Sequence, residues 1–184
     1  ASAVALNRVI GGDPSAILGT LSANGQVLIV NPNGILFGPE SRVDVAGLVA
    51  STMNIADEDF LNGNYVFSQE GKGGFIINAG SITAQPGGFV VLLAQAVENR
   101  ALIQADFGTV ALASGKKATL SLENDSLISV VVDEAVETEV FGPDGVKMDS
   151  AVKNSGSILA QGGKVILTAR VLNKVFDYAI NNTG

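Results

Sequence analysis

The sequence has no cysteine and no histidine among its 184 residues. Without cysteine the chain can form neither a disulfide nor a thiolate metal site, and without histidine it lacks the commonest general base and metal ligand. Tryptophan is absent as well. No apolar run approaches the ~20 residues that a membrane-spanning helix needs. We therefore predict no membrane span, no catalytic residues, no cofactor and no metal site.

Positive charge is scarce and scattered. The chain carries 11 lysines and arginines against 18 aspartates and glutamates, which gives a net charge of −7. The basic residues occur singly, so they form neither a stripe that could neutralise phosphates nor a patch for anionic lipid. The sequence predicts no nucleic-acid partner.

Glycine and small aliphatic residues are plentiful instead. The 22 glycines exceed the usual share of ~7%, and alanine, valine, isoleucine and leucine supply most of the rest. This mixture favours many short strands that are separated by tight corners. The length fits a single domain.

From Asn78 onward the sequence repeats itself with a period of about 20 residues. Residues 78–85 recur at 154–161 and more loosely at 99–106, and each copy is followed by a similar second half at 87–94, 162–169 and 108–113. A unit of this size cannot bury its own apolar side, so neighbouring copies must stack. The repeats therefore predict an all-β fold, a parallel β-helix or solenoid in which stacked inward positions are occupied by Ile82, Ile103 and Ile158 and by Val90, Val110 and Val165. A leucine-rich repeat is the alternative, but it needs leucines at fixed offsets that these units lack.

The segment Asn31-Pro32-Asn33-Gly34-Ile35 lies between two apolar runs, at 27–30 and 35–37. Pro32 fixes φ near −65°, and Asn33-Gly34 tolerates φ > 0, so the chain bends sharply here. None of these side chains is nucleophilic or basic.

Other segments predict local additions to the solenoid. Residues 56–61 favour a short helix, and residues 15–21 could form one helical turn. Strands at 65–68 and 75–77, joined by the glycine-rich turn 70–74, predict an extra-helical hairpin. We interpret the acidic stretch 123–153 as a coil with an enlarged surface loop, and we expect residues 133–149 to be dispensable for the fold.

Two acidic groups are the best candidates for general acid–base catalysis, namely Asp57-Glu58-Asp59 and Asp133-Glu134. A β-helical polysaccharide lyase or hydrolase needs carboxylates along one sheet face over several coils. Here the acidic residues cluster in loops, which favours solvated turns. Calcium is not favoured either, since neither the Gly-Gly-x-Gly-x-Asp repeat nor an EF-hand spacing occurs. The glycosylation triplet is present twice, at 124–126 and 181–183.

Several motifs resemble the secretion domain of two-partner-secretion exoproteins, the filamentous-haemagglutinin-type adhesins of Gram-negative bacteria. They occur in that family's order, and the match is closer to the high-molecular-weight-adhesin branch. The matching stretches are Ala5-Leu6-Asn7-Arg8-Val9, residues 22–27, Asn31-Pro32-Asn33-Gly34-Ile35, residues 50–55, residues 59–67 and the later Gly-Gly-x-Val-x-Leu segments.

The resemblance implies a right-handed parallel β-helix that acts as the secretion signal of a larger exported adhesin. Its partners would be the POTRA domains and the barrel of a cognate outer-membrane transporter, recognition would use an unfolded or partly folded segment, and the product would reach the cell surface through the periplasm. It implies no catalysis. The positions carried over from the family's motifs are Asn7, Arg8, Asn31, Pro32, Asn33, Gly34 and Ile35, with a role in secretion or in structure.

Two other functions remain alternatives: a β-helical polysaccharide-degrading enzyme, and a stalk segment that binds a glycan. A host or matrix ligand of the exoprotein, whether glycan or protein, would be bound through the rest of that protein.

The resemblance also bears on the ends of the chain. Family members carry further strands before the Ala-Leu-Asn-Arg-Val stretch, and Asn182-Thr183-Gly184 looks like the start of another repeat. We therefore expect a single secretion domain over residues 1–184 that lacks the first strands, continues into further coils and has open, association-prone ends.

Overall fold

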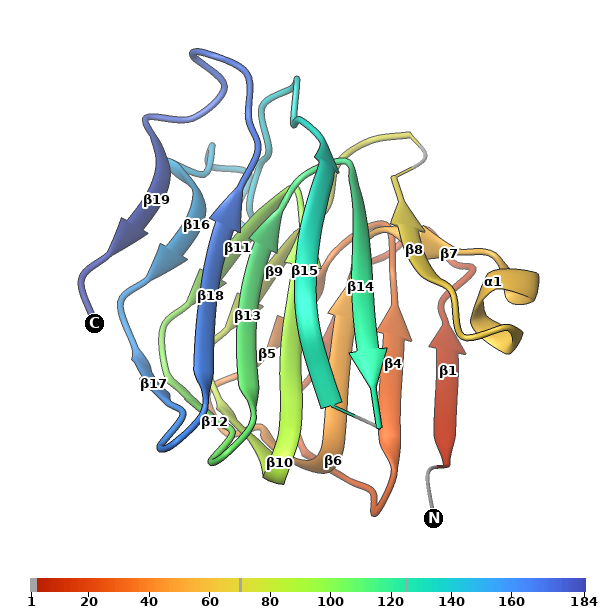
Figure 1. Cartoon of the computed structure of the whole chain (residues 1–184). Helices are drawn as coiled ribbons and strands as arrows, with labels where there is room; N and C mark the ends of the chain where they lie inside the picture. Colours follow the sequence, from red (N-terminus) through yellow and green to blue (C-terminus); the bar gives the residue numbers. More distant parts are fainter. Residues whose placement is uncertain (1–2, 70, 125) are drawn as a thin grey trace.

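The computed structural model describes residues 3–69, 71–124 and 126–184. Strands from successive turns of the chain stack in parallel and form three faces around an apolar interior (Figure 1). This arrangement is the parallel β-helix that the repeats predict.

The first face is a six-stranded parallel sheet. In spatial order its strands are β2 (Ser15–Ile17), β5 (Ile35–Phe37), β9 (Phe75–Asn78), β11 (Ala96–Asn99), β16 (Ser150–Asn154) and β19 (Tyr178–Asn182).

The second and third faces share two long strands, β6 (Arg42–Ser51) and β10 (Ser81–Ala94), each of which contributes its first part to one face and its second part to the other. The second face adds β3 (Thr20–Ser22), β12 (Leu102–Gln104) and β17 (Ser157–Leu159). The third face adds β1 (Val4–Arg8), β4 (Gln26–Val30), β13 (Thr109–Ser114) and β18 (Lys164–Ala169).

The register confirms the predicted stacking positions. Ile82 lies beside Ile103, which lies beside Ile158. Val90, Val110 and Val165 form an equivalent column one face further on. Ile82, Ile103, Val90 and Val110 belong to the interior cluster and Ile158 packs against it, whereas Val165, at the end of its column, is exposed.

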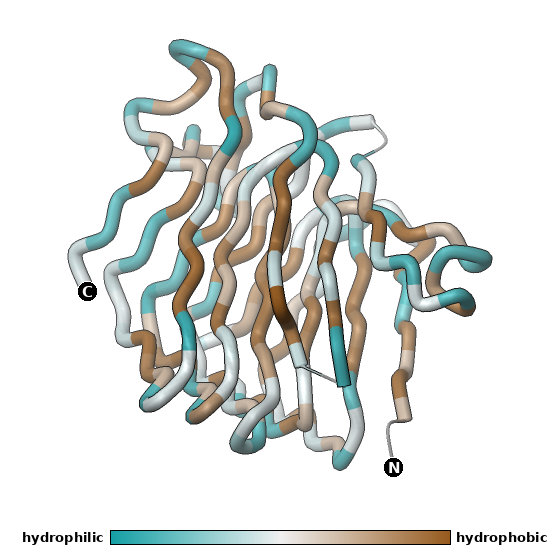
Figure 2. Tube along the Cα trace, viewed as in Figure 1, coloured by the Kyte–Doolittle hydropathy of each residue, from teal (hydrophilic) through white to brown (hydrophobic). Residues whose placement is uncertain are grey.

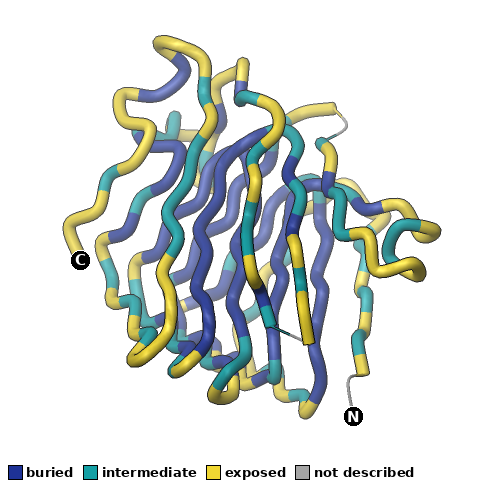
Figure 3. Tube along the Cα trace, in the orientation of Figure 1, coloured by how far each residue is buried: buried dark blue, intermediate teal, exposed yellow. Residues whose placement is uncertain are grey.

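A separate antiparallel sheet covers the third face from outside. Its strands are β7 (Asn54–Ile55), β8 (Tyr65–Ser68), β14 (Lys117–Glu123) and β15 (Ser126–Glu134), and the short helix α1 (Asp57–Leu61) lies between β7 and β8. Figure 3 colours the central strands of the third face as buried, whereas β1 and β18 at its two edges are intermediate or exposed. Burial on both sides explains why β4 and the second half of β10 are continuously apolar, as the hydropathy colouring in Figure 2 shows.

The first face is covered by two loops. Val136 and Val140 from one loop and Val175 and Phe176 from another pack on the outward side of β9 and β11. Among the described residues, the second face has no comparable apolar cover, and its outward side chains include Arg42 and Asp44, both exposed.

Several local predictions need correction. The strands at 65–68 and 75–77 do not pair with each other: β8 pairs with β7 and β14, whereas β9 belongs to the first face. The extra-helical hairpin is formed instead by β14 and β15. Residues 15–21 form β2 and part of β3 rather than a helical turn, because each finds a parallel partner in the next coil.

The acidic stretch also differs from our interpretation. Residues 126–134 are an antiparallel strand outside the solenoid, and the loop after them is not a free excursion, because Val136 and Val140 are buried. The short helix at 57–61 is confirmed. Two predictions lie partly outside the described residues: Glu70 of the glycine-rich turn and Asp125 of the first glycosylation triplet.

In the part of the chain that the structure describes, no helix is both long and apolar enough to cross a membrane.

Candidate functional site

The Asn31 side chain is the centre of the sharp corner. It is fully buried, and its amide group is bonded on both sides. Asn31 Nδ2 donates to the Asp13 carbonyl at 3.0 Å and to Ser15 Oγ at 2.8 Å. Asn31 Oδ1 accepts from the Asn33 backbone N–H at 3.0 Å and from Asn33 Nδ2 at 3.1 Å. One side chain thus ties the corner to the segment that precedes β2.

Asn33 and Gly34 add further hydrogen bonds at this corner, and we call the whole set of bonds the clamp. Asn33 Nδ2 also donates to the Gly11 carbonyl at 2.8 Å, and the Gly34 N–H closes the turn on the Asn31 carbonyl at 3.2 Å. Gly34 has φ +130°, a conformation that L side chains rarely adopt, and a Cβ there would lie 3.0 Å from the ring of Phe75. Pro32 is half-buried and lies between Asn31 and Asn33, the two residues whose side chains form these bonds.

Ile35 begins β5 directly after the corner. It is fully buried in the interior cluster, and it lies between Ser15 of β2 and Ile76 of β9 in register. Because the Ser15 N–H donates to the Gly34 carbonyl at 3.0 Å, the corner sets where β2 joins the sheet.

Asn7 and Arg8 lie at the end of β1, beside the strand that leads into the corner: Arg8 is in register with Val30, the residue before Asn31, and Asn7 with Ile29. The Arg8 side chain is directed elsewhere, since Arg8 Nη1 donates to Asp57 Oδ1 at 2.8 Å and Arg8 Nη2 donates to the Ile55 carbonyl at 2.6 Å. Arg8 therefore ties β1 to the junction of β7 and α1. Asn7 is exposed.

The acidic candidates do not converge on one site. The Asp57 carboxylate is engaged by Arg8, and Asp133 accepts a hydrogen bond from Thr119 Oγ1 at 2.9 Å. No group of three or more potential metal ligands occurs within the described residues.

A ladder of four asparagines, three of them buried, runs along the first face, and the sequence analysis missed it. Nδ2 of Asn78 donates to Oδ1 of Asn99, Asn99 donates in the same way to Asn154, and Asn154 to Asn182, each at 2.8 Å. The available signal was an asparagine near the start of every repeat copy. The ladder holds successive coils in register.

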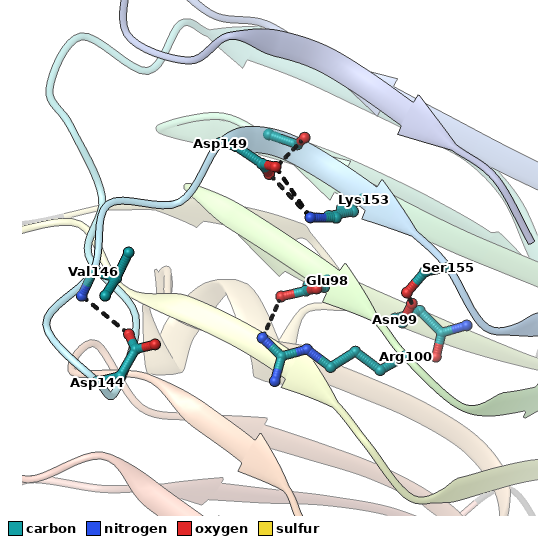
Figure 4. Close-up of polar contacts among 9 residues, drawn as sticks. Glu98, Asn99, Arg100, Asp144, Val146, Asp149, Lys153 and Ser155 are labelled. Carbon is teal, nitrogen blue, oxygen red and sulfur yellow. Dashed lines mark hydrogen bonds and ion pairs between the residues drawn. The ribbon is translucent and has the colours of Figure 1, made fainter.

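A second polar cluster lines a cavity of about 280 Å³ beside the loop that carries Asp144 (Figure 4). Arg100 Nη2 donates to Glu98 Oε2 at 2.7 Å, and this bond raises the pKa of Arg100. Burial raises the pKa of Asp149, but hydrogen bonds from Lys153 and Ser150 outweigh it, so the pKa of Asp149 lies below its ordinary value. The arginine and the two lysines that line this cavity are each paired with a carboxylate, so its described lining offers no unpaired cationic group to a ligand.

Comparisons with known proteins assign the chain to a family. The family model described as TPS secretion domain matches residues 1–184. A heme/hemopexin-binding protein of Haemophilus influenzae strain Rd is 36% identical over 183 residues, which cover 95% of this chain and 18% of that protein. A second Haemophilus influenzae protein of the same name is 35% identical over 205 residues and 99% of this chain, and 20% of that protein is covered.

A solved structure is also similar. The crystal structure of the HMW1 secretion domain from Haemophilus influenzae superimposes with a TM-score of 0.80 at 29% sequence identity. The match covers 100% of this chain and 44% of that chain. The chain spans about a fifth of the length of the two curated relatives.

Proposed function

Since the chain belongs to the family of TPS secretion domains, we propose that it directs a larger surface exoprotein to a cognate outer-membrane transporter. The periplasmic POTRA domains of that transporter bind the domain, the barrel exports the chain, and the solenoid folds at the cell surface. The observation that carries this proposal is the family match over all 184 residues together with a β-helix like that of the HMW1 secretion domain.

The motif residues serve this function through the fold. Asn31, Asn33 and Gly34 fix the first coils, because their hydrogen bonds join the corner to residues 11–15. Pro32 sets the direction of the bend and Ile35 anchors it in the interior. Arg8 attaches the first strand to the extra-helical sheet, and Asn7 offers an exposed amide beside it.

An enzymatic role has no support in the site, since the candidate carboxylates lie apart and are engaged in other contacts. The name of the two curated relatives refers to whole proteins of which this chain spans a fifth. Haem iron in proteins is held by histidine, cysteine, methionine or tyrosine, and the first two are absent here. We therefore assign any host or matrix ligand of the exoprotein to the rest of that protein.

Replacing the corner tests the proposal. We expect Asn33→Ala with Gly34→Val to lower both export and stability. A β-branched residue at φ > 0 costs roughly 1–3 kcal/mol, and the clamp to Gly11 is lost as well. The measurements are secretion with the cognate transporter and thermal unfolding of the purified domain.

Gly145 supplies a control outside the family's motifs. It has φ +75°, and a Cβ on it would meet nothing within 4 Å. Gly145→Val places a β-branched residue at φ > 0 without disturbing the clamp, so secretion should persist. Equal secretion by the two variants, with equal melting temperatures, would remove the corner from the mechanism.

A further inference from the structure

A cavity of about 710 Å³ lies between two loops that connect the sheets of the domain. One wall is the loop between β8 and β9, which contributes residues 71–73. The other wall is the loop after β15, which contributes Thr138, Glu139 and Phe141. Both loops lie along the upper margin of the molecule in Figure 1. The cavity has the size of a small-molecule site, and such sites combine apolar surface with a few polar groups.

The wall that carries Phe141 is held in place by its neighbours. Val140 is buried in the cluster that covers the first face, whereas Phe141 is 51% exposed and lines the cavity. The Glu139 carboxylate is paired with Lys147 at 2.9 Å, and the backbone of Phe141 is bridged to that of Lys147. The wall therefore presents an aromatic ring on a fixed backbone, and its carboxylate is already neutralised.

The opposite wall carries a free cation. Gln69 Nε2 donates to the Lys72 carbonyl at 2.9 Å, which fixes the backbone of the loop. Gly73 lies directly against the buried Gln95 side chain, because a Cβ on Gly73 would collide with Gln95 Oε1. The Lys72 ammonium makes no ion pair with any residue that the structure describes. The cavity thus has an unpaired positive charge on one wall and the Phe141 ring on the other.

We propose that this cavity binds an amphipathic anion, a molecule with an apolar body and one carboxylate, sulfonate or phosphate group. The apolar body packs on Phe141, where its removal from water is favourable. The anionic group pairs with Lys72, and a hydrogen bond between charged partners is stronger than a neutral one. Fatty acids and anionic membrane lipids share this chemistry. Because the two walls come from segments far apart in the chain, the site exists only in the folded domain, and it is independent of recognition by the transporter.

Two measurements on the 184-residue chain test the site and separate the two sources of ligand. Calorimetric titration with laurate tests a free amphiphile, and flotation with phosphatidylglycerol vesicles tests a membrane lipid. Lys72→Glu and Phe141→Asn should each weaken binding about tenfold or more, because each removes one charge-assisted or apolar contact. Losses in the titration alone identify a free amphiphile as the ligand, and losses in flotation identify a membrane lipid.

Lys174→Glu and Phe107→Asn are the matched controls, because Lys174 and Phe107 are exposed and neither lines the cavity. They should leave binding unchanged, and circular dichroism should show all four variants folded. Equal losses with the control variants, or no saturable binding of either laurate or vesicles, would overturn the site and leave the proposed function untouched. Secretion with the cognate transporter tests that function separately and should be the same for all four variants.

Discussion

At the scale of single residues, the corner shows how a short motif acts without any reactive group. Asn31 is useful because its amide both donates and accepts, so one buried side chain satisfies two donors and two acceptors. A carboxylate or an aliphatic residue of similar size lacks one or both capacities. Asparagine is therefore required by hydrogen-bond count rather than by chemistry on a substrate.

Phe107 gives a residue-scale prediction. The corner has positive φ in each of the three repeat copies: Gly87 and Gly162 provide it with φ of 82° and 69°, but the copy between them has Phe107 at 56°. Left-handed backbone costs an ordinary L residue roughly 1–2 kcal/mol, and asparagine tolerates it better. Since the Phe107 ring is 70% exposed, Phe107→Asn should stabilise the domain by about 1 kcal/mol.

Denaturant unfolding of purified protein measures the change. Phe107→Leu is the control, because leucine keeps the backbone strain and should bring no gain. A less stable Phe107→Asn variant would mean that the contact of the ring with Gly162 outweighs the strain.

At the scale of elements, the asparagine ladder links four strands of the first face. Asn99 is its best-connected rung, since Oδ1 accepts from Asn78 while Nδ2 donates to Asn154 and to the Ala101 carbonyl at 3.0 Å. Asn182 is the exposed rung at the other end of the described ladder. The same residue type should therefore contribute very differently at the two positions.

We expect Asn99→Ala to destabilise the domain by about 2–4 kcal/mol, because it leaves buried polar groups of two neighbours without a partner. Asn182→Ala should cost less than about 1 kcal/mol, because water replaces the lost bond. Chemical denaturation of the two variants in parallel gives the comparison. Similar losses at both positions would contradict an energetic role for the ladder interior.

At the scale of the whole molecule, two of the three faces of the solenoid are buried under additional structure. The antiparallel sheet covers the third face and the loops around Val136 and Val175 cover the first. The additional structure thus contributes to the core, and the burial of Val136 and Val140 argues against our expectation that residues 133–149 are dispensable.

Replacing residues 135–149 with a Gly-Ser linker should cost about 3–6 kcal/mol, from the loss of two buried valines at roughly 1.5–3 kcal/mol each. Replacing only the exposed tip at 143–146 is the control and should change stability little. Thermal unfolding and binding of a hydrophobic dye measure both. An unchanged melt after the larger replacement would restore the sequence-based expectation.

The sequence by itself determined the solenoid, its repeat and the inward columns through Ile82 and Val90, because stacked coils are encoded in a local period. It also determined the position of the corner, since proline, asparagine and glycine act on their own backbone dihedrals. The family resemblance likewise rested on short local sequence motifs.

Only the tertiary structure decided which strands pair outside the solenoid. The pairing of β8 with β14 joins segments far apart in the chain, and β9 was assigned to the wrong partner because a glycine-rich turn between two strands suggests a hairpin. What covers the outward side of β4 and β10 was likewise decided by the tertiary structure. Partners of Asn31 and the rungs of the asparagine ladder were likewise set by long-range register, which no local pattern specifies.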